Sequence, residues 1–120
     1  MQDELLRREL EHDPTVDITT IGRRSGQPRR IEIWVMATDE GLFITGTPGR
    51  RDWLANLRAN PELVVHLKRD AHVDLRATAV EVTDDSARRR VIEHLVSSWY
   101  RGQAPVEELV ASAPMVQLTL

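Results

Sequence analysis

Residues 30–38 carry an aliphatic side chain at every second position, and this pattern constrains the fold more than any other part of the chain. Successive side chains of a strand point to opposite faces, so the run predicts one strand with two distinct faces. The face expected to be core carries Ile31, Ile33, Val35 and Ala37. On the other face, Trp34 and Met36 are apolar, which fits a ligand wall or a subunit interface better than open solvent.

Five further runs have the β-branched or alternating composition of strands, and four have the spacing of short helices. In the run over residues 73–82, Val80 and Val82 change parity, which predicts a bulge or a bend near residues 78–80. The strands predicted beside 30–38 are 15–21, 42–46, 63–68, 73–82 and 115–120. The predicted helices are 3–12, 53–59, 87–99 and 106–111, and Thr83-Asp84-Asp85 is the expected N-cap region of the third.

Without the short helical turn at 106–111, the order of these elements is α-β-β-β-α-β-β-α-β, with hairpin-length links and no βαβ spacing. This order predicts a mainly β protein with short helices, in which five to six antiparallel strands form a small barrel rather than a doubly wound sheet. A chain of 120 residues is expected to form a single domain over residues 1–120, with a short N-terminal helix at about 3–12.

A basic stretch, residues 21–30, separates the first two predicted strands. It holds four arginines, two glycines and a proline, and no acid. Glycines let backbone N–H groups converge, and arginines supply bidentate donors for phosphate or carboxylate. The pattern fits an anion clamp or a solvated surface hairpin, and the composition leaves both open.

Charge is unevenly distributed along the chain. Residues 22–58 contain seven basic and four acidic residues, a balance of +3, whereas the rest has nine and fifteen, a balance of −6. A local anionic ligand fits this asymmetry. A general nucleic-acid partner does not, because such domains are usually basic throughout and this chain has a net charge of −3.

Several kinds of chemistry lack their sequence signals. The chain has no cysteine, no G-x-S-x-G or P-loop motif, and no ligand spacing among its four histidines, so no metal site is predicted. We expect His66 and His72 on exposed strand faces. An enzyme of this composition would rely on a bound cofactor for the difficult step. With no signal-peptide layout and no apolar run of bilayer length, a cytoplasmic location is expected.

Two sequence blocks resemble the deazaflavin-dependent nitroreductase family. The first is T-T-x-G-R-x-S-G-x-P-R over residues 19–29, and the second is W-x-x-N-L-x-x-N-P over residues 53–61. The resemblance, which covers about residues 18–68, implies a split β-barrel similar to FMN-binding proteins. It also implies binding of coenzyme F-420, an 8-hydroxy-5-deazaflavin with a phosphate and a polyglutamate tail.

The resemblance also implies where the cofactor would lie. The phosphate and tail carboxylates would be held by Arg23, Arg24, Ser25, Gly26 and Arg29. The deazaflavin ring would meet Thr47, Pro48, Gly49 and Trp53. Independently of the resemblance, Trp34 and Trp53 are candidates to line the apolar part of an anionic cofactor. Arg50 and Arg51 occupy a segment that is usually longer in the family.

The activity implied is hydride transfer from C5 of the reduced deazaflavin to a quinone, an enone or a nitroaromatic. No catalytic residue is assigned, since no proton donor stands out. The expected partner is a small-molecule acceptor, with peripheral membrane access for a lipophilic quinone, and the chain as monomer or homodimer. The alternatives are an FMN- or FAD-binding split-barrel reductase, and a non-catalytic protein of the same fold that binds a cofactor, a lipid or haem.

Overall fold

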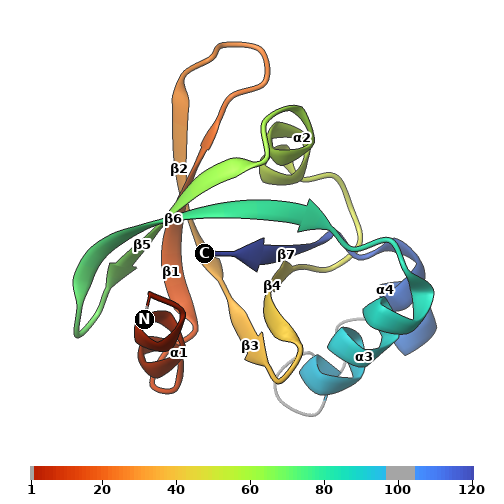
Figure 1. Ribbon diagram of the computed structural model, residues 1–120. Helices are drawn as coiled ribbons and strands as arrows, with labels where there is room; N and C mark the ends of the chain where they lie inside the picture. Colours follow the sequence, from red (N-terminus) through yellow and green to blue (C-terminus); the bar gives the residue numbers. More distant parts are fainter. Residues whose placement is uncertain (1, 97–104) are drawn as a thin grey trace.

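The computed structural model describes residues 2–96 and 105–120, which form one curled antiparallel sheet with four short helices around it (Figure 1). The strand order in the sheet is β2-β1-β5-β6-β7-β4-β3. The strands are β1 (Thr15–Ile21), β2 (Pro28–Trp34), β3 (Met36–Thr38), β4 (Gly41–Thr45), β5 (Glu62–Lys68), β6 (His72–Glu81) and β7 (Met115–Thr119). The helices are α1 (Gln2–Leu10), α2 (Asp52–Ala59), α3 (Asp85–Val96) and α4 (Val106–Ser112).

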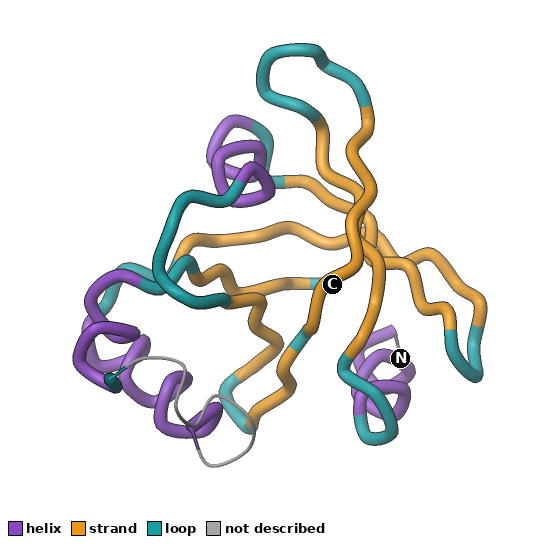
Figure 2. The backbone as a smooth tube through the Cα atoms, turned by 180° about the vertical axis from the view of Figure 1, so that it is seen from behind, coloured by secondary structure: helices purple, strands orange, loops and turns teal. Residues whose placement is uncertain are grey.

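Val35 is the residue at which the sheet curls round on itself. β2 and β3 are separated in the chain by Val35 alone, yet they lie at the two opposite edges of the sheet. The two edges must therefore approach each other, and the strands wrap into a half-barrel (Figure 2). The Val35 N–H donates a hydrogen bond to the Pro14 carbonyl at 3.0 Å, and its side chain is 1% exposed.

This arrangement corrects three details of the predicted sheet. The described residues contain seven strands rather than five to six, because the run 30–38 is divided between β2 and β3. Ile31 was expected in the core but is 38% exposed, since β2 is an edge strand paired only with β1. The bulge expected near residues 78–80 is absent, since β6 keeps continuous pairing there and Val80 is 61% exposed.

Two apolar clusters hold the helices on the sheet. The larger one fills the curl of the sheet and includes Leu6 of α1 together with Trp53 and Leu57 of α2. The smaller one lies where α3 and α4 cover β4 and β7, around Phe43 and Ile92 (Figure 1). The predicted N-cap is confirmed, because the Asp84 carboxylate accepts a hydrogen bond from the Ala87 N–H at 2.9 Å. The predicted continuation of this helix to residue 99 lies outside the described residues.

The basic stretch forms a tight loop between β1 and β2 that projects beyond the body of the sheet (Figure 1). The Gly22 N–H donates to the Gln27 carbonyl at 2.8 Å, and the Gly26 N–H donates to the Gly22 carbonyl at 2.9 Å. Gly26 has a φ of 70°, a left-handed conformation that glycine adopts without steric cost. Within the described ranges, no helix is both long enough and apolar enough to cross a bilayer.

Candidate anion-binding site

A cavity of about 440 Å³, here called the basic pocket, lies between the β1–β2 loop and α2. Its lining residues are Thr20, Gly22, Arg23, Arg24, Ser25, Arg29, Ile31, Asp52, Trp53 and Asn56. Residues from the two blocks of the motif, separated by about thirty positions, thus meet around one space. Local turn chemistry builds the loop, and the packing of α2 beside β1 supplies the opposite wall.

Asn56 connects these two walls. Its side-chain oxygen accepts hydrogen bonds from the Arg23 backbone N–H at 3.1 Å and from Arg23 Nη1 at 3.0 Å. Its side-chain nitrogen donates to Thr20 Oγ1 at 3.2 Å. Asn56 is 3% exposed, so each of these bonds satisfies a group that would be costly to leave unpaired. The basic loop is therefore fixed in position by a buried amide on the helix.

The arginines of the pocket differ in how far their charge is neutralised. Arg23 Nη2 lies 3.4 Å from Asp52 Oδ1, but the Asp52 side chain is 90% exposed, so this ion pair is weak. Arg24 and Arg29 form no hydrogen bond or ion pair with any other described residue through their side chains. Two exposed guanidinium groups thus remain available for an anion, beside a third that is positioned by Asn56.

The apolar side of the pocket comes from Trp53 and Ile31. Trp53 is 7% exposed and belongs to the larger core cluster, so only a small part of its ring faces the cavity. Trp34 lies elsewhere, in a separate cavity of about 300 Å³ that it shares with Met36 and Phe43. The two tryptophans considered for one ligand therefore line two different cavities.

The structure brings together part of the predicted site. Arg23, Arg24, Ser25, Arg29 and Trp53 line the basic pocket, whereas Gly26 shapes the loop without lining it.

The loop after β4 lies apart from the basic pocket. Thr47 and Pro48 do not line it, and Gly49 lines a different cavity together with Arg50 and Arg51. Arg51 Nη2 donates to the Thr47 carbonyl at 2.9 Å and to Thr47 Oγ1 at 3.1 Å, which fixes the conformation of this loop.

Five residues that line the pocket were not among the predicted cofactor contacts: Thr20, Gly22, Ile31, Asp52 and Asn56. Thr20 is the second threonine of the T-T-x-G-R block, and Asp52 directly precedes the tryptophan of the second block, so both lie within or beside the motif. No signal in the sequence distinguishes Ile31 from its core-facing neighbours. His66 was expected on an exposed face but is 7% exposed, because β5 is paired on both sides, with β1 and with β6. Its ring is hydrogen-bonded to Thr19 and Asp74.

The fold and the pocket define a small curled β protein with a preformed cavity lined by three arginines. The chain belongs to the F420H(2)-dependent quinone reductase family, whose sequence model matches residues 3–107. The family is one of oxidoreductases, and the motif residues around the basic pocket all lie inside the matched range.

Solved structures with the same fold come from several bacteria. A conserved hypothetical protein from Mycobacterium tuberculosis matches with a TM-score of 0.71 and 22% identity, covering 100% of this chain and 80% of that one. A putative pyridoxamine 5'-phosphate oxidase from Listeria innocua matches with a TM-score of 0.71 and 15% identity, covering 99% and 93%. HutZ, the haem storage protein from Vibrio cholerae, matches with a TM-score of 0.71 and 15% identity, covering 98% and 88%. At these identities the likeness shows the split-barrel fold alone.

Proposed function

We propose that this protein is a reductase that binds reduced coenzyme F-420 in the basic pocket and reduces a quinone. The observation that carries the proposal is the pair of unneutralised guanidinium groups, Arg24 and Arg29, beside an Arg23 that Asn56 holds in place. The family to which the chain belongs supports the choice of cofactor and acceptor. Enones and nitroaromatics are further candidate acceptors, because they are electrophilic in the same way.

The residues of the pocket fit the charged part of such a cofactor. Phosphate and carboxylate oxygens accept bidentate hydrogen bonds from guanidinium groups, and three arginines face one cavity here. The Ser25 hydroxyl lines the same wall, and its oxygen accepts a hydrogen bond from the Gln27 N–H at 3.2 Å. Trp53 and Ile31 offer apolar contact beside this charge. The family resemblance implies that the tail and phosphate are held by Arg23, Arg24, Ser25, Gly26 and Arg29, and the chemistry of the lining residues supports this assignment.

When bound and reduced, the deazaflavin would supply a hydride. The chain's own contribution would be to bind and orient: a preformed pocket holds reactants in one geometry and lowers the entropic part of the barrier. We assign no proton donor among the pocket residues, and solvent can provide the proton that follows. Thr47, Pro48 and Gly49 remain candidates for ring contacts, although these residues do not line the basic pocket itself.

The test begins with a titration of the purified chain with coenzyme F-420, followed by tryptophan fluorescence, with FMN and haem titrated in parallel. Micromolar or tighter binding of the deazaflavin alone, lost in Arg24→Ala/Arg29→Ala, is the expected result. A preference for FMN would indicate a flavin-dependent reductase instead, and a preference for haem would indicate a non-catalytic haem-binding protein.

Turnover is tested separately, with the reduced deazaflavin and a water-soluble quinone. We expect the absorbance of the oxidised deazaflavin to appear only when protein and quinone are both present. Tight binding without any such turnover, with quinones, enones and nitroaromatics all tried, would overturn the reductase proposal and leave a binding protein.

A further inference from the structure

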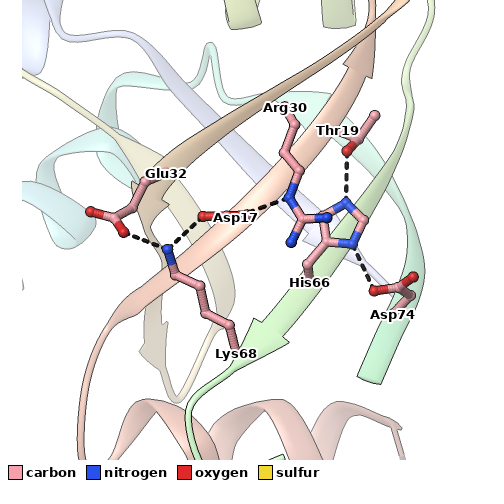
Figure 3. A network of polar contacts seen from close by, with 7 residues as sticks. All are labelled: Asp17, Thr19, Arg30, Glu32, His66, Lys68 and Asp74. Carbon is pink, nitrogen blue, oxygen red and sulfur yellow. Dashed lines mark hydrogen bonds and ion pairs between the residues drawn. The ribbon is translucent and has the colours of Figure 1, made fainter. Parts of the chain in front are cut away.

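Three polar side chains form a connected chain on the outer face of β1, β5 and β6, away from the basic pocket. Asp74 Oδ1 lies 2.7 Å from His66 Nδ1, and His66 Nε2 lies 2.6 Å from Thr19 Oγ1 (Figure 3). The strand register brings them together, because His66 pairs directly with Asp74 on β6 and with Asp17 on β1, two residues from Thr19.

Hydrogen-bond chemistry fixes the direction of this chain. An ionised carboxylate can only accept, so His66 Nδ1 must carry the proton that it donates to Asp74. In the neutral imidazole with its proton on Nδ1, Nε2 is the acceptor, and it accepts a hydrogen bond from the Thr19 hydroxyl. A hydroxyl bonded to the Nε2 of a histidine whose Nδ1 is held by a carboxylate is the arrangement that activates a nucleophile in hydrolases.

The neighbouring cations, Lys68 and Arg30, pair with carboxylates other than Asp74. Asp17 is occupied by two cations, since it accepts hydrogen bonds from Lys68 Nζ at 2.7 Å and from Arg30 Nε at 2.9 Å (Figure 3). Lys68 also pairs with Glu32. His66 itself is 7% exposed, which limits competition from water for its ring nitrogens.

Thr19 opens onto a cavity of about 520 Å³, here called the outer pocket. Aliphatic side chains, among them Ile21, Val64 and Leu120, contribute to its lining. Arg76 lines the outer pocket as well. Val64 of β5 pairs with Thr19 on β1 and with Arg76 on β6, so the three residues form one row across the sheet. Arg76 is exposed and has no ion-pair partner among the described residues, so its guanidinium is available to a negative charge that develops beside Thr19.

We propose that Thr19, His66 and Asp74 form a second active site, which hydrolyses small carboxylic esters of apolar acids. Thr19 Oγ1 attacks the ester carbonyl carbon while its proton passes to His66 Nε2, and Arg76 stabilises the oxyanion. The bond from carbon to the alcohol oxygen then breaks, and the alcohol leaves with the proton from Nε2. Water attacks the resulting acyl-threonine, gives one proton to Nε2, and the acid leaves as Thr19 regains its proton.

The experiment uses the full chain without added cofactor and p-nitrophenyl butyrate as substrate. We expect a burst of nitrophenol followed by steady turnover, reduced at least 100-fold in Thr19→Ala and His66→Asn and retained in Thr19→Ser. His72→Asn is the matched control, because His72 is an exposed imidazole on β6 and reports uncatalysed imidazole background. A fluorophosphonate probe should label Thr19, identified by peptide mass, and should not label His66→Asn.

Asp74 acts through His66, so it is a positioning residue and needs a different readout. Asp74→Asn should lower kcat at least tenfold while KM stays within twofold, and its melting temperature should match that of the parent chain. Activity that persists in Thr19→Ala but disappears in His66→Asn would identify the imidazole as nucleophile and overturn the proposal. The proposal is also overturned if the parent chain hydrolyses the ester no faster than His66→Asn does. Labelling of a residue other than Thr19 by the probe would overturn it as well.

The circular dichroism of each variant shows whether the fold is kept. Should Thr19→Ala fail to fold, the comparison of Thr19→Ser with His66→Asn and the position of the probe still decide the question. This site lies on the face opposite the buried Thr20 of the basic pocket, so its failure would leave the reductase proposal untouched.

Discussion

The side-chain oxygen of Asn56 accepts two hydrogen bonds from Arg23, one from its backbone N–H at 3.1 Å and one from Nη1 at 3.0 Å. A residue of α2 thereby fixes both the backbone of the basic loop at Arg23 and the orientation of the Arg23 guanidinium group. The same amide donates to Thr20, so all three bonds depend on a single buried side chain.

Replacing this amide should disorder the loop. Asn56→Ala should lower the free energy of unfolding by about 1–3 kcal/mol, because buried partners on Arg23 and Thr20 lose their bonds. It should also weaken F-420 binding, as measured by tryptophan quenching. Asn60→Ala is the matched control, since Asn60 caps the other end of α2 and does not line the basic pocket. Wild-type affinity in Asn56→Ala would mean that the loop needs no anchor.

The arginines themselves should carry the binding energy for an anionic cofactor. Arg23→Ala and Arg29→Ala should each weaken F-420 binding by ~1.5–3 kcal/mol, the range for hydrogen bonds to charged groups. Titration of each variant measures the change, with Arg69→Ala as control because Arg69 pairs with Asp13 outside the pocket. Unchanged affinity in both pocket variants would remove the anion clamp.

Arg88 should be essential to the fold rather than to binding. It is 9% exposed and donates to the carbonyls of Val110 at 2.6 Å, Ala113 at 2.5 Å and Val82 at 2.9 Å. Its charge thus lies at the C-terminal end of α4, where a cation is favoured by the helix dipole.

Arg88→Ala should lower the free energy of unfolding by about 3 kcal/mol or more, because several buried carbonyls lose their donor at once. Urea denaturation measures it, with Arg90→Ala as the control on the same helix. Arg90 pairs with the exposed Glu40, and its loss should cost less than about 1 kcal/mol. Equal effects of the two substitutions would contradict the assigned role of Arg88.

Asp17 should make stability depend on acid pH. Hydrogen bonds from Lys68 and then from Arg30 lower the pKa of Asp17 below its ordinary 3.8, against the opposing effect of desolvation. The stabilising contribution is therefore fully present above pH 3.8 and is lost as the pH falls through the lowered pKa.

Urea denaturation at a series of pH values between about 2.5 and 7 should show this dependence of the unfolding free energy on pH. The difference in unfolding free energy between the parent and Asp17→Asn should be largest near neutral pH and should shrink below pH 3.8. Asp70→Asn serves as a control, because Asp70 is exposed and has no ion-pair partner among the described residues. A difference that stays constant with pH would contradict the assignment.

Local sequence signals were sufficient for the type of most elements, but not for the division of residues 30–38 into β2 and β3. β-Branched composition identified β1 and alternation identified β5, whereas helical spacing identified α2 and a capping signal identified the start of α3, because period and turn chemistry are set by residues a few positions apart. The basic loop was identified from its composition. Of the cofactor contacts that the family resemblance implied, five line the basic pocket: Arg23, Arg24, Ser25, Arg29 and Trp53.

Only the tertiary structure decided which distant residues meet. The curl at Val35, which sends β2 and β3 to opposite edges, depends on the closure of the whole sheet. The contact of Asn56 with Arg23 depends on how α2 packs, and the burial of His66 depends on the register of three strands. Periodicity reports the face on which a side chain lies, whereas strand order and register determine what that side chain touches.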